Sequence, residues 1–173
     1  MLIAVAKHPT QKDLARALGA DQVIDPDDVF QRIRFATAAR RLDGMDRSLL
    51  LGGADVTFEC VGRASSLSEA VRFTRGGGTV VAVGMPGDEK VDWAAIWQRE
   101  LTVTGAYAYG SEPKRKGRRT FELALEAAPE IHLEKLTGPL FALGDYREAI
   151  AYAMSAGRLG AVKVAFDLRG LRA

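Results

Sequence analysis

Apolar, β-branched segments alternate with segments of helical periodicity along most of this chain. Buried strands are predicted at Leu2–Ala6, Asp55–Cys60 and the run TVVAVG at 79–84. Between the strands, apolar residues recur at helical spacing, as they do from Leu14 to Leu18. Such alternation is typical of βαβ units with parallel strands. We therefore expect an α/β fold with a mainly parallel, doubly wound sheet.

Turn and capping residues predict where the other elements begin and end. Gly19 is placed to end the first helix, and Ser66 with Glu69 matches a capping box for a helix that ends at Gly76–Gly78. Arg41–Gly53 is rich in turn residues and is expected to be a long connection. Further strands are expected at Gln22–Ile24, Leu101–Gly110 and Val162–Leu168, and further helices at about Val29–Arg41, Asp92–Trp97, Phe121–Ala128 and Asp145–Met154.

Length, charge and hydropathy exclude several classes of protein. The 173 residues have room for one sizeable core, and no apolar run approaches the ~20 residues of a membrane span. The net charge of +2 does not predict nucleic-acid binding, and the basic run KRKGRR at 114–119 is expected to be a solvated loop. The N-terminal apolar run is too short for a secretory signal, so a cytoplasmic location is expected.

The chain has few soft metal ligands. Cys60 is the only cysteine, and His8 and His132 are the only histidines. This set is too small for a zinc site of the usual kind, so no metal ligands are assigned.

Candidate ligand contacts lie just after the predicted strands. In an open parallel sheet, ligands bind beyond the carboxyl ends of the strands. Those ends are Ala6–His8, Cys60–Gly62, Val83–Gly87 and Ala106–Tyr107, and most of them are followed by small residues. Glycine turns also serve simply to reverse the chain, so these positions alone leave a nucleotide site undecided.

Five blocks together are similar to a known family. They are LIAVAKHPTQKDLARALGADQVIDP, GGADVTFECVG, GGGTVVAVGMPG, LTVTGAYAYG and YREAIAYAMSAGRLGAVKVAFDL. In this order they resemble the coenzyme-binding half of the medium-chain zinc alcohol dehydrogenases. Gln31–Leu51 is the least similar segment.

The resemblance implies a Rossmann-like fold with strand order 3-2-1-4-5-6, in which Leu2–Ala6 is the second strand. The first strand, its G-x-G-x-x-G turn and the zinc-bearing catalytic domain have no counterpart in the sequence. A truncated protein is therefore expected. Residues 1–111 would form a partial NAD(P)-binding domain, and residues 112–173 would hold helices and a strand that in the family return to the catalytic domain.

The family's coenzyme contacts can be carried over by position. An acidic ribose ligand would stand at Ala6, and its replacement, followed by Lys7 and His8, favours NADP over NAD, although Lys7 could also be a plain exposed lysine. Lys163 corresponds to a basic residue near the pyrophosphate, with simple exposure as the alternative. The loops beside the ribose and the nicotinamide carboxamide correspond to Cys60, Val61, Gly62, Arg63, Val83, Gly84, Met85, Ala106 and Tyr107. Cys60 is expected to be a small buried residue rather than a nucleophile.

Loss of the central first strand would leave two sheet edges unpaired. The second strand would then pair with the fourth, exchange with another copy, or stay open, and the C-terminal strand Val162–Leu168 would lose its sheet. The edge strand Leu101–Tyr109 is where family members commonly dimerise, so a homodimer is plausible.

Two functions stay open. The chain is the coenzyme-binding portion of a zinc-dependent, NAD(P)-linked alcohol dehydrogenase, inactive by itself and without catalytic residues of its own, or it is a non-catalytic nucleotide-binding remnant or truncated gene product. The sequence does not identify the substrate.

Overall fold

The computed structural model describes residues 1–44, 48–131 and 133–169. The chain divides into two compact units. Unit 1 contains residues 1–27 and 111–173, and unit 2 contains residues 28–110. The sequence predicts a division by expected role, into a coenzyme-binding part at residues 1–111 and a remainder at residues 112–173. That division stays a prediction.

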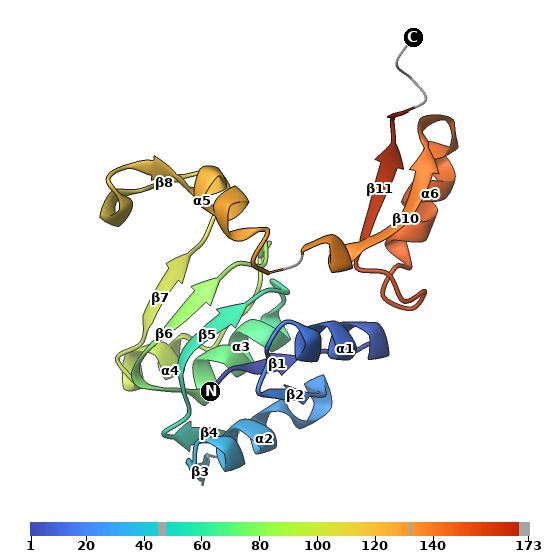
Figure 1. Cartoon of the computed structure of the whole chain (residues 1–173). Helices are drawn as coiled ribbons and strands as arrows, with labels where there is room; N and C mark the ends of the chain where they lie inside the picture. Colours follow the sequence, from blue (N-terminus) through green and yellow to red (C-terminus); the bar gives the residue numbers. More distant parts are fainter. Residues whose placement is uncertain (45–47, 132, 170–173) are drawn as a thin grey trace. The chain divides into compact units, whose positions relative to one another are not determined.

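Unit 2 is built on a parallel three-stranded sheet in the order β5-β6-β7. The strands are β5 (Ala54–Glu59), β6 (Thr74–Ala82) and β7 (Thr102–Gly105). Helix α3 (Ala64–Phe73) connects β5 to β6 and packs against both strands, and α4 (Trp93–Gln98) connects β6 to β7 (Figure 1). This arrangement confirms the predicted α/β class with parallel strands joined by helices.

The boundaries of α3 differ from the prediction. The helix begins at Ala64, and Ser66 lies in its first turn, where its hydroxyl accepts a hydrogen bond from the Arg63 backbone N–H at 3.4 Å. The prediction of a capping box formed by Ser66 and Glu69 is therefore wrong. The helix ends at Phe73, before the glycines, because Thr74 is extended and its hydroxyl donates to the Ala70 carbonyl at 2.7 Å. Strand β6 consequently starts at Thr74 and includes the glycine segment.

The connection predicted at Arg41–Gly53 contains a β-hairpin instead. Helix α2 (Val29–Ala36) ends five residues earlier than predicted, since the Thr37 hydroxyl donates to the Ile33 carbonyl at 2.7 Å and Ala38 has a left-handed φ of 51°. Strands β3 (Arg40–Asp43) and β4 (Ser48–Leu51) then pair in antiparallel register. Leu50 anchors the hairpin, with 0% of its surface exposed.

Unit 1 begins with a short βαβ arrangement. Strand β1 (Ile3–Val5) pairs in parallel with β2 (Gln22–Ile24), and α1 (Pro9–Ala17) contacts both strands. A 3-10 turn, η1 (Pro26–Asp28), follows β2. Strands β1 and β5 belong to separate sheets, so the pairing of the second strand with the fourth, one of the three alternatives, is not seen among the described residues.

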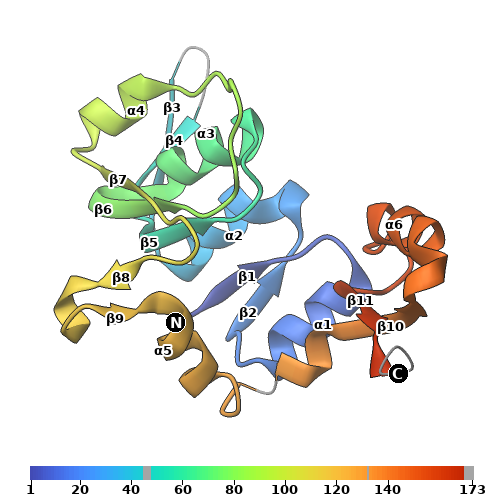
Figure 2. The same ribbon diagram turned by 90° about the horizontal axis from the view of Figure 1, so that it is seen from above.

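The remainder of unit 1 comes from the C-terminal third of the chain. The β-hairpin of β8 (Ser111–Glu112) and β9 (Arg118–Arg119) runs into α5 (Thr120–Ala127), as Figure 2 shows. A second βαβ arrangement follows, with β10 (Thr137–Ala142), α6 (Tyr146–Met154) and β11 (Lys163–Asp167). Short 3-10 turns complete this part at η2 (Pro113–Arg115), η3 (Leu133–Leu136) and η4 (Leu143–Asp145).

The C-terminal strand has a partner within the chain. The parallel pairing of β11 with β10 contradicts the expectation that this strand would be left without a sheet. Sequence reasoning missed β10 because Gly138 and Pro139 interrupt its apolar pattern. Within the described part of the chain, no helix is long and apolar enough to cross a membrane.

Candidate functional site

The loops that follow β5 and β6 meet at the carboxyl edge of the unit 2 sheet. Two glycines make this approach possible. A Cβ on Gly84 would lie 2.3 Å from the Gly62 nitrogen and 2.6 Å from the Val61 nitrogen. A Cβ on Gly62, whose φ is +74°, would lie 2.7 Å from the Met85 carbonyl oxygen. Because these neighbours are backbone atoms, no side chain can move aside, and both positions require glycine.

A buried carboxylate lies beneath the two loops. Glu59 is the last residue of β5, and only 4% of its surface is exposed. Its Oε1 accepts a hydrogen bond from the Val61 N–H at 2.9 Å, and its Oε2 accepts one from the Gly62 N–H at 2.9 Å. The sequence analysis did not select Glu59, although an acidic residue that ends an apolar strand is an unusual feature that could have identified it.

The same residue also holds the second loop. The backbone carbonyl of Glu59 accepts hydrogen bonds from the N–H groups of Val83 and Gly84, both at 2.8 Å. The side chain and main chain of one residue therefore fix backbone groups in both loops.

A second carboxylate closes the start of α3. Glu89, in the loop after β6, accepts a hydrogen bond from the Ala64 N–H at 2.8 Å and lies 3.7 Å from an Arg63 guanidinium nitrogen. Backbone N–H groups at a helix start are unsatisfied within the helix, so a carboxylate is favourable there. Arg63 is thus tied to the loop that contains Met85.

Cys60 is exposed, which corrects the expectation of a buried side chain. Strand β5 ends at Glu59, so Cys60 begins the turn and does not face the sheet interior. Partial burial of the thiol, and then the charge of Glu59, raise the pKa of Cys60 above its ordinary value. A raised thiol pKa disfavours the thiolate, so Cys60 is poorly suited to be a nucleophile.

The third strand end completes this edge. Ala106 follows β7 and donates its N–H to the Ala82 carbonyl at 3.0 Å, which continues the parallel register. The side chains beyond the strands are open to solvent, with Met85 92% and Tyr107 96% exposed. Unit 2 thus brings together the nine predicted site residues Cys60, Val61, Gly62, Arg63, Val83, Gly84, Met85, Ala106 and Tyr107.

The other four predicted residues belong to unit 1. Ala6 follows β1, is 7% exposed and donates its N–H to the Ile24 carbonyl at 3.0 Å. Lys7 is exposed, and His8 is the N-cap of α1, where its N–H donates to the Gln11 side chain at 3.2 Å. Lys163 lies farther along the chain, at the start of β11, opposite Thr137 of β10.

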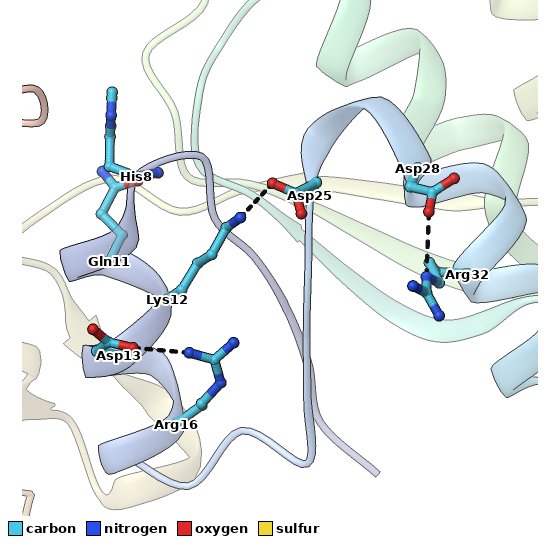
Figure 3. A network of polar contacts seen from close by, with 8 residues as sticks. All are labelled: His8, Gln11, Lys12, Asp13, Arg16, Asp25, Asp28 and Arg32. Atoms are coloured by element: carbon cyan, nitrogen blue, oxygen red, sulfur yellow. Dashed lines mark hydrogen bonds and ion pairs between the residues drawn. The ribbon is translucent and has the colours of Figure 1, made fainter.

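Helix α1, which follows β1, carries charged side chains that form ion pairs. Figure 3 shows Lys12 of α1 directed toward Asp25, with their charged atoms 2.5 Å apart. Arg16 pairs with Asp13 on the same helix at 2.8 Å. Apart from the partly shielded Lys12, these side chains are largely exposed, so the ion pairs contribute little stability.

The described residues offer no donor set for zinc. Among them, no group of three or more histidine, cysteine or acidic side chains is arranged to hold a metal ion. The acidic neighbour of Cys60 is Glu59, whose carboxylate oxygens already accept hydrogen bonds from backbone N–H groups. The donor set in this part of the chain does not fit the metal.

The chain is similar in sequence to known dehydrogenases. The family described as zinc-binding dehydrogenase matches residues 1–127. L-idonate 5-dehydrogenase of Vitis vinifera is 30% identical over 161 residues, which cover 90% of this chain and 39% of that enzyme. The chain therefore spans about two fifths of that relative's length.

Solved structures of dehydrogenases are also similar to this chain over part of their length. The 2R,3R-butanediol dehydrogenase of Bacillus subtilis has a TM-score of 0.68 and 25% identity, covering 94% of this chain and 42% of that one. A zinc-binding dehydrogenase of Sinorhizobium meliloti 1021, solved bound to NADP, has a TM-score of 0.66 and 26% identity, covering 95% and 44%. The fold is Rossmann-like, and by its match over residues 1–127 the chain belongs to the zinc-binding dehydrogenase family.

Proposed function

We propose that this chain is the coenzyme-binding portion of a zinc-dependent, NAD(P)-linked dehydrogenase that acts on an alcohol or polyol. The observation that carries the proposal is the pair of glycine-packed loops at the carboxyl edge of β5 and β6. Ligands of open parallel sheets bind at this edge, and small residues there admit a flat ring close to the backbone. The S. meliloti relative, bound to NADP, supports the choice of coenzyme.

Individual residues then take separate roles. The backbone of Val83, Gly84 and Ala106 would hold the nicotinamide carboxamide, with Met85 and Tyr107 beside it. Cys60, Val61, Gly62 and Arg63 would line the riboses. Ala6, Lys7 and His8 would contact the adenosine ribose, and Lys163 would lie near the pyrophosphate. When bound, the nicotinamide supplies hydride transfer at its C4 atom.

The proposal favours NADP over NAD. Ala6 offers no carboxylate that would repel a 2′-phosphate, and the exposed Lys7 follows it directly. Ala6 itself is 7% exposed, and its N–H donates to the Ile24 carbonyl of β2.

Calorimetric titration of the purified chain with NADPH, NADP, NADH and NAD tests the coenzyme role. Micromolar affinity for the phosphorylated forms supports it, and binding that is weaker than millimolar for all four contradicts it. Zinc with a panel of alcohols and polyols should give no turnover above that of a mock purification, because the donors for zinc do not fit. Reproducible turnover would contradict the predicted inactivity of the isolated chain.

A non-catalytic nucleotide-binding remnant is the second candidate. It is favoured by the sequence, which contains no G-x-G-x-x-G turn to receive the pyrophosphate. The two candidates differ in affinity: a remnant would bind adenine nucleotides weakly and would not distinguish oxidised from reduced coenzyme.

The outer edge of β7 is proposed as a dimer contact. The strand lies at the end of the order β5-β6-β7, and all four of its residues are exposed. A second copy could continue the sheet by pairing with this edge. Sedimentation velocity over a concentration series should show a dimer that Val103→Lys disrupts; a concentration-independent monomer would overturn the dimer.

A further inference from the structure

We propose that Glu59 is a positioning residue that couples the two loops of the coenzyme edge, so that neither loop can move without the other. The inference rests on the proposed function for its consequence but on geometry alone for its mechanism. Glu59 is not among the residues to which the resemblance assigned a role.

The coupling follows from the contacts of Glu59. Its carboxylate accepts the N–H groups of Val61 and Gly62, at distances of 2.9 to 3.1 Å. Its carbonyl accepts the N–H groups of Val83 and Gly84 at 2.8 Å. A movement of the side chain therefore disturbs the first loop, and a movement of the main chain disturbs the second.

The close approach between the glycines makes the coupling rigid. With a Cβ on Gly84 placed only 2.3 Å from the Gly62 nitrogen, the backbone of the second loop already lies against the amides that Glu59 holds. If those amides lost their acceptor, they would rotate, and the loop containing Val83 and Gly84 would have to follow. The amides bound to the Glu59 carbonyl and those bound to its carboxylate therefore move together.

The surroundings of Glu59 explain why a carboxylate suits this buried position. A carboxylate has two acceptor oxygens and no donor, so it matches two neighbouring N–H groups that have no other partner. Hydrogen bonds to an ionised acceptor are about twice as strong as neutral ones. No basic side chain lies within ion-pair distance of Glu59 in the described part of the chain, so the backbone amides alone stabilise its charge.

The substitution Glu59→Gln tests this arrangement with little change in shape. The amide nitrogen would replace Oε2 and present hydrogens to the Gly62 N–H, so the 2.9 Å hydrogen bond becomes a repulsion and only the longer one to Oε1, at 3.1 Å, remains. Thr57→Val is the matched control: it removes the 2.7 Å hydrogen bond to Thr74 on the same face of β5 but touches neither loop.

Amide hydrogen exchange measured by NMR on the full chain without coenzyme decides the coupling. In Glu59→Gln, exchange at Val61, Gly62, Val83 and Gly84 should rise together by about tenfold or more, the effect of losing a hydrogen bond to a charged group. Thr57→Val should leave all four unchanged. Faster exchange at Val61 and Gly62 alone would overturn the inference, because the loops would then be independent. Equal exchange in both variants would overturn it as well.

NADPH fluorescence then measures the consequence. In a titration, Glu59→Gln should weaken NADPH binding by about tenfold. At saturation, it should also shift the emission maximum of the bound NADPH. This maximum reports the surroundings of the nicotinamide and not the stability of the protein. An unchanged emission maximum together with freed loop amides would overturn the link to the coenzyme. If the wild-type chain binds no NADPH, the proposed function fails, and the exchange measurement still decides whether Glu59 couples the loops.

Discussion

The ends of β5 and β1 are held in place by different means. After β5, backbone atoms of two loops touch through Gly62 and Gly84, and a 4% exposed carboxylate fixes the amides. After β1, the Ala6 N–H continues the backbone pairing with β2, and the groups beyond it are charged side chains: Lys12 of α1 pairs near the surface with Asp25, which follows β2.

The difference indicates that the end of β5 sets the geometry of the site, whereas the end of β1 sets its coenzyme specificity. A loop fixed by backbone contacts tolerates almost no substitution, so it can hold a ligand group that is the same in every coenzyme. A strand end surrounded by exposed side chains can change its charge without disturbing the fold, which suits the part of a site that distinguishes NADP from NAD. The following experiments test this division, beginning with the largest effect.

Replacement of Gly84 by alanine should be the most damaging single change. Its Cβ would overlap the backbone nitrogens of Val61 and Gly62 at 2.3 to 2.6 Å, and neither can yield without moving β5. We expect a loss of about 3 kcal/mol in the free energy of unfolding, measured by urea denaturation.

Gly87 provides the control within the same loop. A Cβ on Gly87 meets nothing within 4 Å, so Gly87→Ala should change stability by less than about 0.5 kcal/mol. Equal stability of the two variants would show that the contact between the loops is not tight in solution.

Lys7→Gln should change coenzyme preference without changing stability. The exposed ammonium group would lose its attraction for a 2′-phosphate, so NADP affinity should fall by about tenfold while NAD affinity stays the same. Lys163→Gln, at the proposed pyrophosphate contact, should weaken both coenzymes equally. Calorimetry with both coenzymes checks this, and an equal loss for Lys7→Gln would refute the role of the β1 end in specificity.

The alkylation rate of the exposed Cys60 tests whether the buried Glu59 raises the pKa of its thiol. Because desolvation and Glu59 raise the pKa of this thiol, iodoacetamide should react more slowly at pH 7.5 than with a free thiol, and the rate should rise at higher pH. Glu59→Gln removes the charge contribution, lowers the pKa and should accelerate the reaction by roughly twofold to fivefold. A rate that does not differ between wild type and Glu59→Gln between pH 7 and 9 would contradict this assignment.

The smallest effect is expected for Lys12 and Asp25. Their charged atoms lie 2.5 Å apart, but the Asp25 side chain is 59% exposed, so solvent screens the pair. A double-mutant cycle with alanine should give a coupling of about 0.2 to 1 kcal/mol, reduced further by salt. A coupling above about 2 kcal/mol would mean that side chains fix the β1 end as firmly as backbone contacts fix the β5 end.

Periodicity predicted most strands and helices because each buries one regular face. It failed where single side chains or pairing partners decide the structure. The hydroxyl of Thr74 ends α3 before the glycines, and Arg40–Asp43 becomes a strand only because Ser48–Leu51 pairs with it. Strand β10 was missed because Gly138 and Pro139 interrupt its apolar pattern, and its pairing with β11 is not evident from the sequence.

The candidate site was predicted in part. Positions after strands could be read from the sequence, and the resemblance assigned roles to them. Glu59 escaped notice because its importance depends on which backbone amides reach its carboxylate, and sequence spacing does not contain that information. Burial of Cys60 was wrongly predicted from the general tendency of free thiols to be buried, whereas β5 ends at Glu59 and leaves Cys60 in the exposed turn.

The discontinuous make-up of unit 1 has a consequence for the growing polypeptide. Residues 28–110 are complete before the second part of unit 1 has been synthesised. His8 and Thr10 lie beside Gly157 and Gly160, which are synthesised only after unit 2. Unit 2 can therefore begin to fold during translation, while the N-terminal segment must wait without its final neighbours. Slowing of translation after residue 110 would lengthen that wait and expose this segment to chaperones and proteases.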